Sequence, residues 1–330
     1  MKKLLLGTAL ASAVLVTGSS FAETKVSGYV ETTVGFHSAG TSSTADNSDP
    51  TAIGYESSID IAVSKELDNG LTLSSGFGTE DGSAADAYLT LTSGNTSFSI
   101  GSDVSGVTDN VSQEDFAPYI AQDIHTTGLS SSFGISGVKT THNSDSFYLK
   151  HKSDMATIEA SYSPQVNSSM GTASANGARP DATAAASGYD LAVYGNMGVE
   201  GLKVGYGISK ATAATSSTAD QEGKGYGVQY SMNNITVGYG VSKNQAVNST
   251  EEKTNTAYGI AYKVNDQLSV GLYQATMEDN SAIDEEYDSI QVGYDLGGMG
   301  ITLSYIQAEN GGGTAGTDEE KLEIRTVTKF

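Results

Sequence analysis

The chain has 330 residues, and its 17 basic and 39 acidic side chains give a formal net charge of −22, which argues against nucleic acid as a partner and favours cations. Cysteine and tryptophan are absent, proline is rare at 4 residues, and tyrosine and glycine are frequent at 18 and 39 residues. This composition disfavours helices and suits strands with tight turns, so we expect an all-β protein that needs no disulfides.

The first 22 residues have the order of a secretory signal peptide. Lys2 and Lys3 precede a mostly apolar run over 4–16, and small residues at Ser20 and Ala22 stand where a signal peptidase cuts. The run is shorter than the roughly 20 residues that a membrane-spanning helix needs, and no later run is long enough. We therefore expect a cleaved signal at 1–22 and a single domain at 23–330.

Beyond the signal, apolar residues recur at every second position, as at Leu202, Val204 and Tyr206. Small or polar residues fill the positions between, so each strand has one face suited to hydrocarbon and one suited to water. Each segment is near the roughly 9 to 11 residues that a tilted strand needs to cross a bilayer. The predicted strands are 24–36, 52–64, 71–79, 84–92, 96–102, 145–152, 155–163, 187–196, 202–210, 224–232, 235–243, 254–263, 267–277, 287–296, 300–308 and 321–330.

The connections between these strands are of two kinds. Tight turns rich in Asn, Asp and Gly are predicted at 68–70, 94–95, 233–234, 265–266 and 297–298. Long loops rich in Ser, Thr, Ala and acidic residues are predicted at 37–51, 164–186, 211–223, 244–253, 278–286 and 309–320. This arrangement is typical of a transmembrane antiparallel β-barrel of 16 strands, with short periplasmic turns and long extracellular loops.

Three other β-structures compete with this prediction. Residues 129–135 alternate as well, but a strand there would move the long 164–186 loop to the periplasmic side, so we place them in the third loop. A row of β-sandwiches should repeat a core motif at domain spacing, and a β-solenoid should show a fixed short period. The sequence shows neither repeat.

Both ends of the predicted barrel resemble those of the Gram-negative general (diffusion) porins. The last strand alternates from Glu323 and closes on the aromatic Phe330, and the first strand begins Lys25-Val26-Ser27-Gly28-Tyr29. The resemblance implies a trimeric barrel in the outer membrane, with the third loop folded into the lumen and Phe330 as an assembly signal. It also implies outer-membrane lipid, lipopolysaccharide, and small hydrophilic solutes and ions as partners.

In that family the third loop forms the constriction, and here its place is taken by 103–143. A negative ring at the narrowest point is predicted from Asp109, Glu114, Asp115 and Asp123. Alternation along the strands predicts further lumen-facing charges at Glu31, Glu56, Asp60, Lys150, Lys152, Lys203, Lys263 and Arg325. The family usually faces its acidic loop with a basic cluster on the early strands, and this chain departs from that pattern because its first four predicted strands offer only Lys25 and Lys65.

These features predict a water-filled pore for passive diffusion of small hydrophilic solutes and ions. The acidic balance predicts a preference for cations that weakens as salt screens the charges. A substrate-specific porin and a plugged barrel that binds a surface partner remain alternatives. We expect no enzyme activity and no cofactor, since the four histidines lack metal-ligand spacing, although calcium binding by the acidic loops stays open.

Overall fold

The computed structural model describes residues 22–38, 51–81, 83–102, 110–120, 145–166, 186–212, 220–245, 252–278, 283–311, 315–316 and 318–330. These residues contain sixteen strands and one helix of a single turn, α1 (Gln113–Phe116). The strands are β1 (Glu23–Ser38), β2 (Thr51–Glu66), β3 (Thr72–Glu80), β4 (Ser83–Ser93), β5 (Thr96–Ser102), β6 (Asp145–Lys152), β7 (Ala156–Val166), β8 (Ala186–Gly195), β9 (Leu202–Ala211), β10 (Gln221–Met232), β11 (Ile235–Gln245), β12 (Glu252–Lys263), β13 (Leu268–Glu278), β14 (Glu285–Asp295), β15 (Met299–Glu309) and β16 (Glu319–Lys329).

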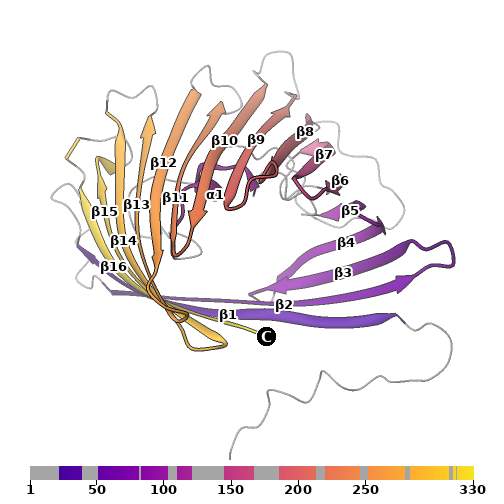
Figure 1. Cartoon of the computed structure of the whole chain (residues 1–330), viewed down its shortest axis with the longest axis horizontal. Coiled ribbons are helices and arrows are strands. Elements are labelled where there is room, and N and C mark those ends of the chain that lie inside the picture. The colour runs from indigo at the N-terminus through magenta and orange to yellow at the C-terminus, as the bar shows by residue number, and fades with distance from the viewer. Residues whose placement is uncertain are drawn as a thin grey trace, which may run out of the picture.

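The sixteen strands close into one antiparallel barrel. Each strand pairs with its neighbours in the chain, and β1 pairs with β16, so the ring has no free edge (Figure 1). The predicted fold is confirmed, and every predicted strand boundary lies within three residues of the observed one. No helix among the described residues is long and apolar enough to cross a membrane.

Alternation along each strand separates an outer apolar face from an inner face. In β14, Ile290 is 57% exposed, whereas Tyr287, Ser289 and Gln291 are at most 3% exposed. The exposed side chains are bulky and apolar, and such a surface is stable in hydrocarbon rather than in water. The inner faces carry the polar and charged side chains.

The first and last strands form the seam of the barrel. The Gly28 and Phe330 backbones exchange two hydrogen bonds of 3.0 Å each, and the register continues to Ser38 opposite Glu320. On the outer face of this seam the hydroxyls of Thr32 and Thr326 lie 2.7 Å apart. Closure therefore satisfies the backbone groups of both terminal strands, as a hydrocarbon environment requires.

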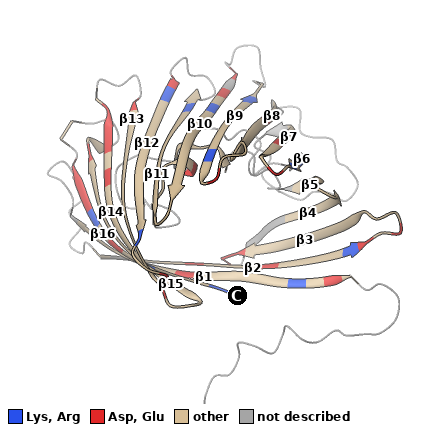
Figure 2. Ribbon diagram, viewed as in Figure 1, with Lys and Arg blue, Asp and Glu red and all other residues tan. Residues whose placement is uncertain are grey.

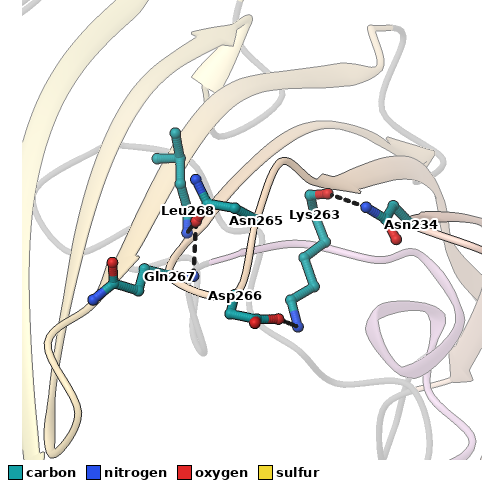
Figure 3. A network of polar contacts seen from close by, with 6 residues as sticks. All are labelled: Asn234, Lys263, Asn265, Asp266, Gln267 and Leu268. Atoms are coloured by element: carbon teal, nitrogen blue, oxygen red, sulfur yellow. Dashed lines mark hydrogen bonds and ion pairs between the residues drawn. The ribbon is translucent and has the colours of Figure 1, made fainter.

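Short turns join the strands at one rim of the barrel. Asn233 and Gly94 have φ of 53° each, the left-handed conformation that tight hairpin turns demand and that Asn and Gly adopt most easily. In the turn after β12 the Asn265 side-chain oxygen accepts the N–H groups of Gln267 and Leu268 at 2.9 Å each (Figure 3). Side-chain hydrogen bonds thus fix the turns that the sequence predicted.

The connections at the opposite rim fall largely outside the described residues, including the alternating stretch 129–135. One of them is short, because β3 and β4 are joined by positions 81–82 alone. The third connection, between β5 and β6, is the longest, and the described part of it is 110–120.

Candidate functional site

The described part of the third loop, residues 110–120, lies inside the barrel. Its helix α1 contacts β10, β11 and β12, and Figure 1 shows it within the ring of strands. Around that ring, β2 and β3 stand eight strands away from β10 and β11. The loop segment therefore narrows the lumen from one side, and the inner faces of the early strands lie across from it.

Ser112 and Asp115 cap the single turn of α1. The Asp115 carboxylate accepts the Ser112 backbone N–H at 2.6 Å and the Ser112 hydroxyl at 2.7 Å. At the other end the Ala117 N–H donates to the Gln113 carbonyl at 3.1 Å, and Pro118 follows, which has no N–H to continue the helix. The Asp115 carboxylate thus holds the shape of the turn.

Two apolar clusters attach the loop segment to the wall. The first consists of Val111, Phe116, Tyr148 and Ala192, with Tyr194 at its edge. The second consists of Ala117, Ala257, Tyr273, Ala275, Tyr287, Ile306 and Ala308, with Tyr119 at its edge. Phe116 is 0% exposed, and burial of such a ring contributes about 1.5–3 kcal/mol.

Wall side chains also accept hydrogen bonds from the loop backbone. The Ser242 hydroxyl on β11 accepts the Gln113 N–H at 2.8 Å. The Gln291 side-chain oxygen on β14 accepts the Ile120 N–H at 2.6 Å. One contact lies at the start of α1 and the other at the last residue of the described segment, so together they fix the direction of this stretch across the wall.

Lys203, a predicted lumen cation on β9, lies under the loop. Its ammonium donates to the Asp115 carbonyl at 3.0 Å and stands 5.2 Å from the centroid of the Phe116 ring. The Gln229 side-chain amide on β10 donates to the Phe116 carbonyl at 3.3 Å. The charge of Lys203 is therefore used to hold the loop backbone, with a cation–π contact beside it.

Glu159 on β7 is a charged residue that our sequence reasoning missed. It is 0% exposed and binds the Lys150 ammonium at 2.7 Å, the Tyr194 hydroxyl at 2.9 Å and the Asn110 side-chain amide at 3.4 Å. Because Lys150 and Glu159 are direct cross-strand partners, register would have revealed the pair. Glu159 connects the wall to the start of the loop segment.

Charges of alternating sign line the inner face of β16. Arg325 pairs with Glu31 of β1, and Lys321 pairs with Glu323 of the same strand. All four side chains are at most 6% exposed. Glu31 and Arg325 were predicted to face the lumen, and the structure places them together across the seam, where they neutralise each other.

Glu56, Asp60 and Glu80 lie on the inner faces of β2 and β3, across the lumen from α1. Glu56 accepts a hydrogen bond from the Tyr29 hydroxyl and neighbours Glu80, and Asp60 and Glu80 are exposed. Among the described residues, no lysine or arginine forms an ion pair with these three carboxylates. Figure 2 shows acidic positions, in red, on strands of both sides of the barrel.

The remaining predicted lysines lie at the rim with the short turns. Lys152 is the last residue of β6 and is exposed, and its backbone N–H donates to the Asn95 carbonyl at 2.9 Å. Lys263 ends β12, and its ammonium lies 3.0 Å from Asp266 (Figure 3). The Asn234 side-chain amide of a neighbouring turn donates to the Lys263 carbonyl at 2.8 Å.

Part of the predicted acidic ring lies outside the described residues. This applies to Asp109 and Asp123 and to the side chain of Glu114. The Phe330 ring is 61% exposed and lies over Gly28. Within the described ranges no group of three His, Asp or Glu side chains could hold a metal ion, and loop-bound calcium stays a prediction.

Comparison with known proteins decides the family. The family model described as Gram-negative porin matches residues 9–313. The chain belongs to the Gram-negative porin family. No curated protein sequence matches this porin, whereas many solved structures do.

The solved structures that resemble this porin share its barrel at low sequence identity. A loop-deletion mutant of OmpT, an outer membrane protein of Vibrio cholerae, has 16% identity and a TM-score of 0.65 over 94% of this chain and 99% of its own. A triple mutant of the Rhodopseudomonas blastica porin has 14% identity and a TM-score of 0.65 over 93% of this chain and 100% of its own. A porin refined at 1.8 Å resolution has 16% identity and a TM-score of 0.61 over 93% of this chain and 100% of its own. These likenesses show the fold, and family membership places the porin in the outer membrane of a Gram-negative cell.

Proposed function

We propose that this porin lets small hydrophilic solutes and ions diffuse passively through the outer membrane, with a preference for cations. Porins are channels, and we propose no enzyme activity for this chain. The observation that carries the cation preference is the distribution of free and neutralised charge on the inner wall.

Most of the predicted cations of the inner wall form ion pairs, whereas a group of carboxylates on β2 and β3 reaches solvent and has no cationic partner within the described part of the chain. Of the five predicted lumen cations, three form ion pairs: Lys150 with Glu159, Lys263 with Asp266 and Arg325 with Glu31. The Lys203 ammonium is held by the uncharged Asp115 carbonyl beneath the loop. By contrast, the carboxylates of Glu56, Asp60 and Glu80 have no such partner among the described residues and reach solvent. A narrowed lumen with exposed negative charge raises the local concentration of cations.

The test is the ion selectivity of the refolded porin in a planar bilayer. The measurement is the reversal potential across a salt gradient, for the wild type and for the combined variant Glu56→Gln, Asp60→Asn and Glu80→Gln. We expect the wild type to prefer cations and the variant to lose most of that preference. Asp288→Asn is the matched control, because Asp288 lies on the outer face of β14 and its loss should leave selectivity unchanged.

Other outcomes of the same recording separate the alternatives. Anion preference in the wild type would overturn the selectivity proposal. Absence of any conductance would favour a plugged barrel that binds a surface partner. Conductance that saturates with one class of solute would favour a substrate-specific porin.

We further propose that the porin is a homotrimer, as the family resemblance implies. Of the exposed tyrosines that the structure describes on the outer face, Tyr55 is in β2 and nine are in β7 to β14. Interfacial tyrosines anchor a barrel among lipid headgroups, so the face of β1 to β6 is better suited to another subunit than to lipid. Native electrophoresis and channel closure in three equal steps would test the assembly.

Export and lipid contacts complete the proposal. We propose that residues 1–22 are removed on export and that the outer faces contact membrane lipid and lipopolysaccharide. Mass spectrometry of the protein isolated from outer membranes would show whether its first residue is Glu23. A different first residue would show that the signal peptide is cleaved at another position.

A further inference from the structure

Eight glycines form a continuous strip on the inner wall beneath the loop segment. Five of them face one another on neighbouring strands, since Gly227 pairs with Gly205 and Gly240, and Gly238 pairs with Gly259. Glycine weakens a strand because it adds backbone entropy and no packing, so such a concentration on one face needs a physical reason. The strip consists of Gly205, Gly207, Gly227, Gly238, Gly240, Gly259, Gly271 and Gly293 on β9 to β14.

The loop segment occupies the space that side chains would fill on this strip. A Cβ placed on Gly238 would lie 1.8 Å from the Phe116 carbonyl oxygen, and one on Gly240 would lie 2.3 Å from the Gln113 carbonyl oxygen. For all eight positions the nearest atom, at 1.8–2.9 Å, belongs to Val111, Gln113, Phe116, Pro118 or Ile120. Real Cβ atoms do not lie at such distances, so a side chain at any of these eight positions would clash with the loop segment.

We propose that this glycine strip is the surface that sets how closely residues 111–120 approach the wall, and thereby sets the width of the pore. The strands cannot move outward to admit a side chain, because each is hydrogen-bonded on both sides within the closed ring. An added methyl group would therefore displace the loop towards the lumen. Displacement would also stretch the hydrogen bonds that Ser242 and Gln291 accept from the loop backbone.

Two inner-face glycines outside the strip have room for a side chain. A Cβ on Gly54 of β2 would meet its nearest atom, the Cβ of Thr33, at 3.6 Å, and one on Gly300 of β15 would meet the Val327 carbonyl at 4.0 Å. Both are ordinary contacts. Gly54→Ala is therefore a matched control for substitutions in the strip.

Compensating substitutions test the proposal directly. Gly207→Ala would place its methyl 2.4 Å from the Val111 Cγ2, and Val111→Ala removes that atom and leaves the Cβ at 3.4 Å. Gly293→Ala would lie 2.4 Å from the Ile120 Cγ2, and Ile120→Ala leaves a Cβ at 3.9 Å. The effect of each glycine substitution should therefore be reversed by the alanine substitution of the loop residue that it contacts, and by no other loop substitution.

The measurements are single-channel conductance in a planar bilayer and the thermal unfolding midpoint in detergent. Gly207→Ala should give a smaller conductance step and a lower midpoint than the wild type, and Gly54→Ala should change neither. Combining Gly207→Ala with Val111→Ala should return both values to those of Val111→Ala alone. If Gly207→Ala does not fold, Gly271→Ala is the milder substitution, because its methyl meets the flexible Ile120 side chain at 2.9 Å.

Two results would overturn the proposal. In one, Gly207→Ala behaves like Gly54→Ala in both measurements. In the other, the double variant stays as perturbed as Gly207→Ala, so that the loop is not the partner of the added methyl. The link to pore width rests on the proposed function, and a wild type without conductance would refute that function while the unfolding midpoints still test the contact.

Discussion

The ion pair between Glu31 and Arg325 should be a main determinant of barrel stability. It joins the inner faces of β1 and β16, and its side chains are 6% and 5% exposed. Removal of one partner from a buried pair leaves an uncompensated charge, at a cost of about 3–5 kcal/mol. We expect Arg325→Met to lower the free energy of unfolding by this amount.

An exposed pair in the same barrel provides the comparison. Lys243 and Glu252 lie 2.8 Å apart with side chains 34% and 47% exposed, and such pairs contribute about 0.2–1 kcal/mol. Lys243→Met should therefore cost several times less than Arg325→Met. The double variant Glu31→Gln with Arg325→Met should recover most of the loss, because no unpaired charge remains.

Equilibrium unfolding in urea from detergent micelles measures all four proteins, with the gel shift of the folded barrel as a second readout. The reasoning would be refuted if Arg325→Met lost no more stability than Lys243→Met. It would also be refuted if the double variant were as unstable as Arg325→Met, because the cost would then come from lost packing rather than from the unpaired charge.

Three further substitutions probe the loop and the outer wall. Phe116→Ala removes the fully buried ring of the loop and should lower the free energy of unfolding by about 3–5 kcal/mol. It should also increase the single-channel conductance, and an unchanged conductance would contradict the placement of the loop in the ion path. Lys203→Met removes the donor to the Asp115 carbonyl and should cost about 1–3 kcal/mol, seen as a lower urea midpoint, whereas an unaltered midpoint would show that the contact contributes nothing. Ile290→Lys puts a charge at the centre of the outer face of β14 and should lower the free energy of unfolding in lipid by about 2–4 kcal/mol. Tyr294→Lys, near the rim, should lower it by less than about 1 kcal/mol. Equal losses would mean that Ile290 does not lie at mid-membrane depth.

The sequence was sufficient to predict the fold because the two signals it needs are local. Alternation of apolar residues marks each strand and its outer face, and Asn and Gly mark the turns where left-handed φ is required, as at Asn233. The largest boundary differences are three residues, at the starts or ends of strands next to long loops. β10, for example, begins at Gln221 because its polar first residues pair with the end of β9, where Lys210 binds Glu222 at 3.0 Å.

The site was less predictable because its contacts join distant parts of the chain. Alternation gave the faces of Glu31 and Arg325, but their partnership depends on closure of the ring. The small inner residues were interpreted as lining water, and the sequence could not show that those of β9 to β14 contact the third loop. Period-2 patterns report which way a side chain points and nothing about what lies in front of it.

Hydrogen bonding between the terminal strands has a consequence for the rate of folding. Residues such as Glu31 and Arg325 are 294 positions apart in the chain, whereas every other strand pair is joined by one connection. The loss of chain entropy on bringing two segments together is therefore larger for this strand pair than for any other pair in the barrel. Contacts between residues so far apart in sequence slow folding. We therefore expect fourteen strands to have both neighbours before the seam forms. The pairing of β1 with β16 should then be the last and slowest step in the folding of the barrel.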